Sequence, residues 1–324
     1  MSKRLRWAPT AVIVAVLCQG VSNADDDPFA EDPQQVPPQA RQALIVCGLP
    51  GDEEHRTLFA ETIEKLYAGL TTRLEIAPEH VVVLFSGEPT DKDGPALRAN
   101  RGPATREKLA ETAAELEKSL QRDDALWVFV LGHAHFDGRF SWLNLPGPDL
   151  NQVEFAKLFA TLPCREQVFF ITTPASGFFV KPLAAAGRAV ITATEADAEV
   201  NETVFPHKLA IALAEPPPMS QFDVDGDGRS TLLDVYLWCA REIAQEYAAN
   251  ELLATEHSLV DDDGDGRGSE LQLDYLSEEL GGRVRAGKKR PALRTADGVR
   301  LRSILLPMPP AAAPEPAAPA EPAS

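Results

Sequence analysis

The chain has 324 residues, 44% of them hydrophobic, and a formal net charge of −18. That length is enough for one large core with a smaller module beside it. The acidic excess excludes nucleic acid and anionic lipid surfaces as favoured partners, because like charges repel, and it favours divalent cations.

The first 24 residues have the pattern of a secretory signal peptide. Lys3, Arg4 and Arg6 precede an apolar run, and Ser22 and Ala24 fit a small-residue cleavage site. The run is shorter than the roughly 20 apolar residues of a spanning helix, which argues against the alternative of a membrane anchor. We therefore expect an extracytoplasmic protein, secreted or periplasmic, with no integral membrane segment after cleavage.

Three further segments have compositions that cannot form a hydrophobic core. Residues 25–40 are acidic and rich in proline, which is typical of a disordered leader. Residues 283–306 form a basic segment that we expect to dock on the chain's own acidic surface or on a partner. Residues 307–324 are mostly proline and alanine and predict an extended, disordered tail. The sequence identifies no particular protein or peptide partner.

Three cysteines remain after cleavage: Cys47, Cys164 and Cys239. An odd number in an oxidising compartment excludes a complete set of disulfides. Because all three lie in apolar segments, we expect buried free thiols.

Residues 41–215 alternate between strand and helix patterns. Short apolar runs predict buried strands, and apolar residues at helical spacing predict helices between them. Such an alternation predicts an α/β fold with a mostly parallel sheet and helices on both faces, in which ligands bind beyond the carboxyl ends of the strands. The expected strands are residues 43–47, 81–85, 126–131, 167–172 and 188–194, and the expected helices are residues 53–73, 105–120 and 151–160, the last beginning with a capping box of Asn151 and Glu154.

Three consecutive motifs carry a family resemblance. The first is VFVLGHAHFDG, which contains His133, followed by a β-ribbon expected at residues 139–145. The second is VFFITTPASGFF, and the third is AVITATEADAE. In this order they resemble the legumain family of cysteine peptidases, within the caspase-like fold, over roughly residues 43–213. The resemblance implies a caspase/legumain-like sheet.

The resemblance also implies roles for single residues. His133 takes the place of the catalytic histidine, and Ser176 matches a serine that follows the nucleophile. Arg56 falls where the family has a substrate-binding arginine, and Glu54 replaces an asparagine that supports the histidine. The nucleophile's own position holds Pro174, which has no nucleophilic side chain.

A cysteine peptidase needs a thiolate within reach of its base, and Pro174 removes it. We therefore expect a domain that has lost peptidase activity and has a binding or scaffold role. The alternative is an active extracytoplasmic hydrolase in which His133 activates Ser176 or Cys47. A histidine at a strand end is more often a hydrogen-bonding structural residue, which is the other interpretation of His133. A weaker alternative is a metal cluster of His133, His135 and Asp137.

Residues 223–234, DVDGDGRSTLLD, match a calcium loop of the EF-hand kind. Such a loop needs oxygen ligands at positions 1, 3, 5, 7, 9 and 12 and a glycine at position 6, here Gly228. Without a cation, carboxylates packed this closely repel one another. The predicted Ca²⁺ ligands are Asp223, Asp225, Asp227, Arg229 through its carbonyl, Thr231 and Asp234.

A second loop, DDDGDGRGSELQ, begins at residue 261 and supplies Asp261, Asp263 and Asp265. Its position 12 is Gln272, a poor ligand, with Glu270 as a possible substitute. A helix expected from about residue 231 to 256 joins the loops, so we predict an EF-hand-like helical region at residues 216–282. We expect calcium to have a structural role there, or to serve an adhesion or surface protein that the α/β part only supports.

Overall fold

The computed structural model describes residues 35–197, 199–283 and 297–309. These residues belong to one compact unit. The predicted signal peptide, residues 25–34 of the leader, residues 284–296 of the basic segment and the tail from residue 310 lie outside the described residues.

A six-stranded sheet has the order β2-β1-β3-β7-β8-β9. The first five strands are parallel, and β9 pairs antiparallel with β8. The prediction of a mostly parallel sheet is therefore confirmed, and each expected strand is present within two residues of its predicted bounds. The strands are β1 (Arg41–Cys47), β2 (Val81–Phe85), β3 (Ala125–Leu131), β7 (Glu166–Ile171), β8 (Arg188–Thr192) and β9 (Leu259–Asp261).

The short strand β9 was not predicted, because three residues are too few for a periodic signal. It lies inside the region expected to be helical, at the start of the second acidic loop. Residues 216–282 thus share a sheet and an apolar core with residues 41–215.

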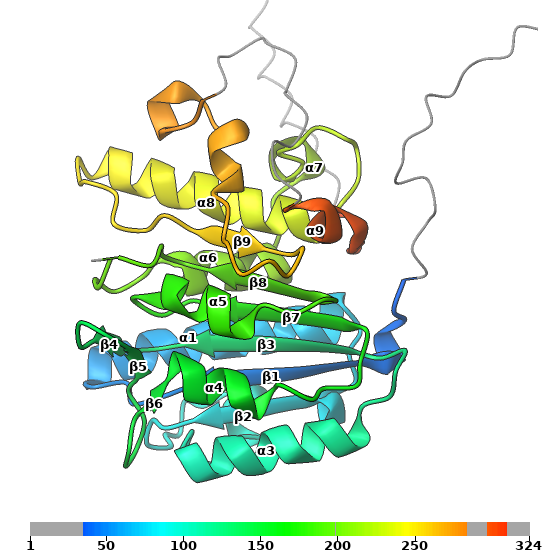
Figure 1. Cartoon of the computed structure of the whole chain (residues 1–324), viewed down its shortest axis with the longest axis vertical. Helices are drawn as coiled ribbons and strands as arrows, with labels where there is room; N and C mark the ends of the chain where they lie inside the picture. The colour runs from blue at the N-terminus through cyan, green and yellow to red at the C-terminus, as the bar shows by residue number, and fades with distance from the viewer. Residues whose placement is uncertain (1–34, 198, 284–296, 310–324) are drawn as a thin grey trace, which may run out of the picture. The chain divides into compact units, whose positions relative to one another are not determined.

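Helices cover both faces of the sheet, as predicted (Figure 1). One apolar core lies between the sheet and α1, α6 and α8, and a second lies between the sheet and α3, α4 and α5. Figure 1 shows α4 and α5 in front of the sheet and α1 and α6 behind it. The helices are α1 (Glu53–Ala68), α2 (Pro95–Arg98), α3 (Arg106–Ser119), α4 (Gln152–Leu158), α5 (Val180–Leu183), α6 (Phe205–Ala214), α7 (Met219–Phe222), α8 (Leu232–Ala249) and α9 (Val299–Ser303).

Local sequence explains where several helices begin and end. The capping box of Asn151 and Glu154 is present at the start of α4, as predicted. The helix predicted at residues 53–73 is α-helical to Ala68 and continues as one π turn. At that point Gly69 lies so close to α6 that a Cβ atom would meet the backbone of Leu213 at 2.8 Å.

A small antiparallel sheet follows β3, in the order β4-β5-β6. It consists of Ala134–Phe136, Ser141–Leu143 and Leu150–Asn151. The predicted ribbon is therefore present and contributes a third, unpredicted strand. Because it leaves from the carboxyl end of β3, it marks the edge of the main sheet at which the sequence predicts a site.

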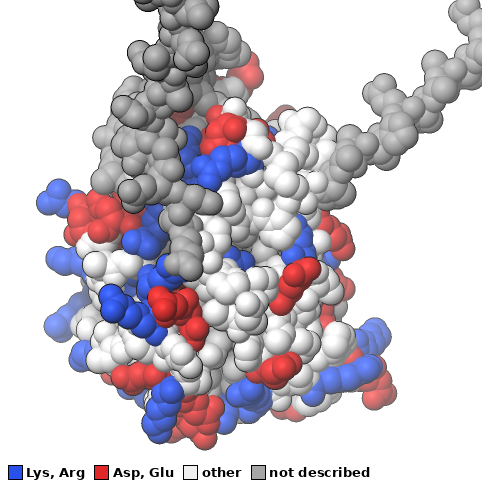
Figure 2. Space-filling model, turned by 90° about the vertical axis from the view of Figure 1, so that its right-hand side faces the viewer, with Lys and Arg blue, Asp and Glu red and all other residues white. Residues whose placement is uncertain are grey.

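The charged side chains of the described residues are mixed over the surface. Figure 2 shows acidic and basic groups interspersed on one face, with uncharged areas between them. Among the described residues, no helix combines the length and the apolar character needed to cross a membrane.

Candidate functional site

His133 lies at the carboxyl end of β3, beside the loop that follows β1. Its Nε2 is hydrogen-bonded to the carbonyl of Pro50 at 2.8 Å. The imidazole packs edge-on against His55, at 4.9 Å between ring centroids, and against Phe59 at 5.4 Å. The ring is therefore held by aromatic contacts on α1 and by a backbone acceptor.

His55 extends this cluster toward solvent. Its Nδ1 lies 2.7 Å from Asp52 and its Nε2 lies 2.9 Å from Glu202. These hydrogen bonds, first with Asp52 and then with Glu202, raise the pKa of His55. The His55 imidazole that packs against His133 is thus held between two carboxylates.

Ser176 is fully buried, and its hydroxyl joins the turn after β7 to the end of β8. The Oγ atom accepts hydrogen bonds from the backbone N–H groups of Ala193 and Thr194, each at 3.1 Å. It also shares a hydrogen bond of 3.1 Å with the Thr194 hydroxyl. The structure therefore gives Ser176 and His133 separate partners, and both lone-pair regions of the hydroxyl already face donors.

The thiols are buried and free in the described chain, as expected. Cys47 is fully buried beside Gly132, and burial raises the pKa of its thiol strongly. A thiol in that state supplies little thiolate for nucleophilic attack. The residues of the possible metal cluster, His133, His135 and Asp137, each have other partners. His135 is hydrogen-bonded to Asn144 at 2.7 Å, and Asp137 accepts hydrogen bonds from backbone amides and from the indole N–H of Trp142.

Arg56, predicted as a substrate-binding residue, is only 7% exposed. Its guanidinium donates to Asp93 at 2.5 Å and to the carbonyl of Glu88 at 3.0 and 2.9 Å. These contacts fasten α1 to the segment between β2 and α2. The Nε and Nη2 atoms of Arg56 are thus hydrogen-bonded within the protein.

The first acidic loop turns around Asp223. Its carboxylate accepts hydrogen bonds from the N–H groups of Gly226 and Gly228, at 2.6 and 3.0 Å. The aspartates at positions 3 and 5 each accept from the N–H group two residues later. Carboxylate oxygens of Asp223, Asp225 and Asp234 lie within 4.8 Å of one another. The loop therefore gathers three oxygen donors at one point.

Asp234 lies in the first turn of α8 and also closes this loop. One of its oxygens accepts from the N–H and hydroxyl groups of Thr231, which caps the helix, and the other accepts from Val224 in the loop. Burial, with contributions from Asp225 and Asp223, raises the pKa of Asp234 to about 7. A bound cation would offset the cost of ionising this buried carboxyl group.

The second loop repeats the same turn. Asp261 accepts from the N–H groups of Gly264 and Gly266, at 2.8 and 2.9 Å. Oxygens of Asp261, Asp263 and Asp265 also lie within 4.8 Å of one another. The loop starts from a strand instead of a helix, so only the first loop has helices on both sides.

Position 12 of the second loop does not face its aspartates. Gln272 accepts a hydrogen bond from the hydroxyl of Tyr236 on α8. Glu270, the possible substitute, lies close to Glu195 and His257. The second loop therefore lacks the carboxylate that Asp234 supplies at position 12 of the first loop.

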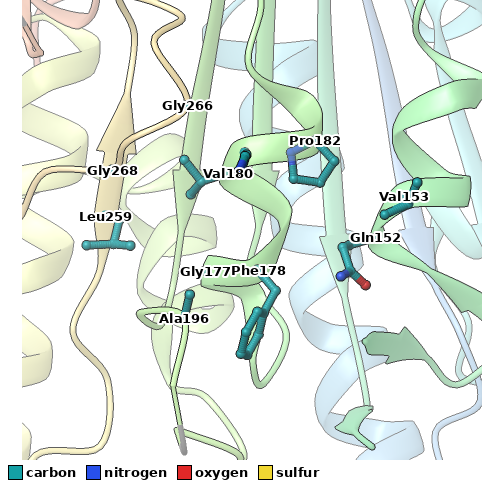
Figure 3. A pocket seen from close by; sticks show the side chains of 11 residues that line it. Gln152, Val153, Gly177, Phe178, Val180, Pro182, Ala196, Leu259, Gly266 and Gly268 are labelled. Carbon is teal, nitrogen blue, oxygen red and sulfur yellow. The ribbon is translucent and has the colours of Figure 1, made fainter. Parts of the chain in front are cut away.

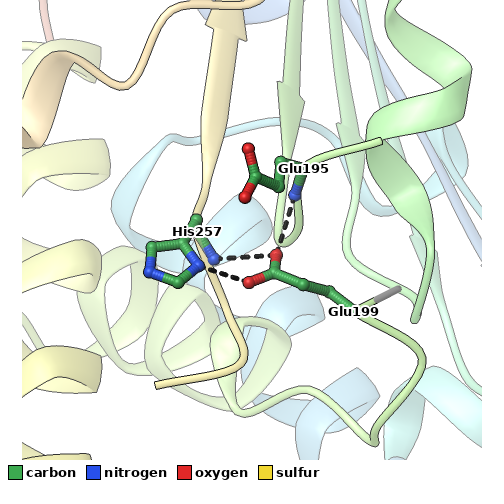
Figure 4. A group of neighbouring side chains, drawn as sticks. All are labelled: Glu195, Glu199 and His257. Atoms are coloured by element: carbon green, nitrogen blue, oxygen red, sulfur yellow. Dashed lines mark hydrogen bonds and ion pairs between the residues drawn. The ribbon is translucent and has the colours of Figure 1, made fainter. Parts of the chain in front are cut away.

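A third group of possible metal ligands was not predicted. Glu195, Glu199 and His257 point toward one another between the end of β8 and the segment before β9 (Figure 4), with ligand atoms within 4.8 Å. Glu199 is hydrogen-bonded to Nδ1 of His257, and this raises the pKa of His257 to about 8. The acidic residues after β8 were visible in the sequence, but their histidine partner is 58 residues away.

A cavity of about 610 Å³ lies between α4, α5 and β9. Figure 3 shows Val153, Phe178 and Pro182 on one side of it and Leu259 with Gly266 on the other. Gly264 and Gly266 of the second acidic loop contact the backbone or side chains at the end of α5. The second loop therefore forms part of the wall of an apolar cavity, which no local sequence signal indicated.

Comparison with known proteins leaves the family open. No protein-family model matches the chain, and no curated protein matches it. Among solved structures, protein GSU0716 from Geobacter sulfurreducens is similar, with a TM-score of 0.40 and 14% sequence identity, over 69% of this chain and 93% of that one.

Proposed function

We propose that the chain is an exported calcium-binding protein whose caspase/legumain-like α/β domain has a binding or scaffold role without peptidase activity. In this proposal Ca²⁺ binds the loop at residues 223–234 and, more weakly, the loop at residues 261–272. The ion stabilises the folded chain and takes no part in catalysis.

The shared geometry of the two acidic loops carries the calcium proposal. In both loops, the carboxylate of the first aspartate accepts hydrogen bonds from the backbone N–H groups of positions 4 and 6. These two positions are glycines with φ between +74° and +81°. Two segments 38 residues apart in sequence thus adopt one turn that directs alternate carboxylates inward. Oxygen-rich loops of this kind suit a hard cation such as Ca²⁺.

Two features support a non-catalytic role. The order of β3, ribbon, α4, β7 and β8 agrees with the legumain resemblance, yet the expected nucleophile position holds Pro174. The nearby substitutes, Ser176 and Cys47, are both fully buried, and Ser176 is already hydrogen-bonded. A cavity of about 610 Å³ offers the scaffold a place for a ligand or peptide partner.

Thermal unfolding with and without a chelator tests the calcium proposal. A cation bound only to the folded state at 100 times its Kd stabilises it by about 2.7 kcal/mol, so the chelator should lower Tm by roughly 5–10 °C. Asp225→Ala should remove most of this difference, whereas Asp123→Ala, an exposed aspartate away from both loops, should keep it. Identical melting curves with and without chelator would contradict calcium binding.

A peptide-hydrolysis assay tests the non-catalytic role separately. The purified protein should release no product from a mixed peptide library above the level of a His133→Ala variant. Hydrolysis by the wild-type chain that disappears in His133→Ala would instead establish the alternative, an active extracytoplasmic hydrolase.

A further inference from the structure

Arg302, on α9 in the C-terminal segment, reaches into the first acidic loop. Its guanidinium donates to Oδ2 of Asp225 at 2.7 and 3.1 Å and lies 3.8 Å from Asp227. The Asp225 side chain is 0% exposed, whereas that of Arg302 is 31% exposed. A buried carboxylate needs a compensating charge, and the chain itself supplies one here.

The backbone around Arg302 is fixed independently of this ion pair. Leu301, Ile304 and Leu306 are buried in the core. Ile304 accepts a hydrogen bond from Leu232 at 2.9 Å, and Leu306 donates to Ser230 at 2.8 Å. Because the backbone of Arg302 is already fixed beside the loop, its side chain loses little conformational entropy when it pairs with Asp225. The guanidinium is therefore a strong competitor of a bound cation for the Asp225 carboxylate.

The second acidic loop holds the other end of the same helix. The carboxylate of Asp262 accepts from the N–H groups of Gly298 and Leu301, each at 2.9 Å, at the start of α9. Displacing the Arg302 side chain would therefore leave α9 in position. Only the long side chain has to move, which makes the exchange of one cation for another possible without unfolding the segment.

We infer that Arg302 is an internal counter-cation that competes with Ca²⁺ for the first acidic loop and so sets the calcium affinity of that loop. This inference rests on the proposed function. Position 3 of the loop must turn an oxygen toward the ion. In the structure one Asp225 oxygen accepts the Asp227 N–H group, and the other is bound by Arg302. A guanidinium and a divalent ion at one carboxylate repel each other, so one must leave.

The test is calorimetric titration of Ca²⁺ into the full chain, with the second loop silenced by Asp263→Asn and Asp265→Asn. Arg302→Gln should tighten binding by about tenfold, because a charge-assisted hydrogen-bonded pair no longer has to be broken. Arg300→Gln is the matched control: it removes the same charge from the same helix, and its guanidinium contacts the carbonyl of Asp262 instead of the first loop. It should change Kd by less than about twofold.

Thermal unfolding of the same variants shows whether a change in Kd comes from the loop or from a loss of overall stability. Without calcium, Arg302→Gln should lower Tm, and with calcium its gain in Tm should exceed that of the wild type. Arg302→Lys, which keeps the charge but not the two-pronged geometry, should have an intermediate Kd.

Calcium binding by Arg302→Gln that equals or falls below that of Arg300→Gln would overturn the inference, while the proposed function would stand on the wild-type titration. If neither the wild type nor Arg302→Gln binds Ca²⁺, both fail. A tenfold gain confined to Arg302→Gln supports both.

Discussion

The carboxyl ends of the parallel strands and the two acidic loops hold their polar groups in opposite ways. Around His133 the polar side chains are already paired: His133 with a backbone carbonyl, Ser176 with two backbone amides, and Arg56 with Asp93. In the acidic loops, carboxylates converge on one another, and backbone N–H groups and Arg302 offset only part of their charge.

This difference indicates where each region obtains its stability. Paired groups around a buried aromatic side chain need no ligand, so the His133 region should be as stable without ligand as with it. Converging carboxylates repel one another and gain from a cation, so the loops should depend on the medium. The comparison therefore separates a region whose polar groups are paired within the protein from one whose carboxylates would gain from a cation.

The largest effect is expected at Phe59, which packs against His133 from α1 and is 2% exposed. Phe59→Ala should lower the free energy of unfolding by about 3–5 kcal/mol, because it removes a buried ring and leaves a cavity. Leu58→Ala, its 36% exposed neighbour, should cost less than about 0.5 kcal/mol. Urea unfolding measures both, and the loss at Phe59 should be equal with calcium and with chelator. A loss that depends on calcium would break the contrast between the two regions.

A smaller effect should distinguish the two loops from each other. A Cβ atom on Gly264 would meet the carbonyl of Ala185 at 2.8 Å, whereas nothing lies within 4 Å of one on Gly228. Both glycines have positive φ, so Gly228→Ala tests the backbone strain alone. We expect about 1 kcal/mol for Gly228→Ala and about 2–4 kcal/mol for Gly264→Ala in urea unfolding. Equal losses would show that the second loop is not tightly packed against the end of α5.

The smallest effect concerns His55. Hydrogen bonds to Asp52 and Glu202 raise its pKa, so the protonated form is favoured in the folded chain. The contribution of protonated His55 to the stability of the folded chain is therefore fully present below the unfolded pKa of about 6.5. It is lost as the pH rises through the pKa of His55 in the folded chain. Glu202→Gln should lower the His55 pKa, measured by NMR titration of the ring protons. An unchanged pKa would mean that Glu202 is too hydrated to matter, and Glu61→Gln, on the exposed side of α1, serves as the control.

Much of the fold followed from local pattern. The five parallel strands, the helices on both faces and the capping box of α4 were predicted, because apolar periodicity and capping depend on residues a few positions apart. The bounds of α1 and α8 were predicted less well. The α-helix α1 changes to a π turn at Gly69, which lies against α6, and α8 ends at Ala249 instead of at about residue 256. The strand β9 was missed because its pairing with β8, and not its three residues, makes it a strand.

By itself, the sequence determined the positions of the glycines and aspartates in the two acidic loops and the proline at position 174, since these depend only on residue type and spacing. The tertiary structure alone decided which partners occupy the candidate groups. Arg302 meets Asp225 across 77 residues, and His257 meets Glu199 across 58. Such pairings arise when distant segments are packed onto one sheet, because the hydrophobic core brings together side chains that no local pattern connects.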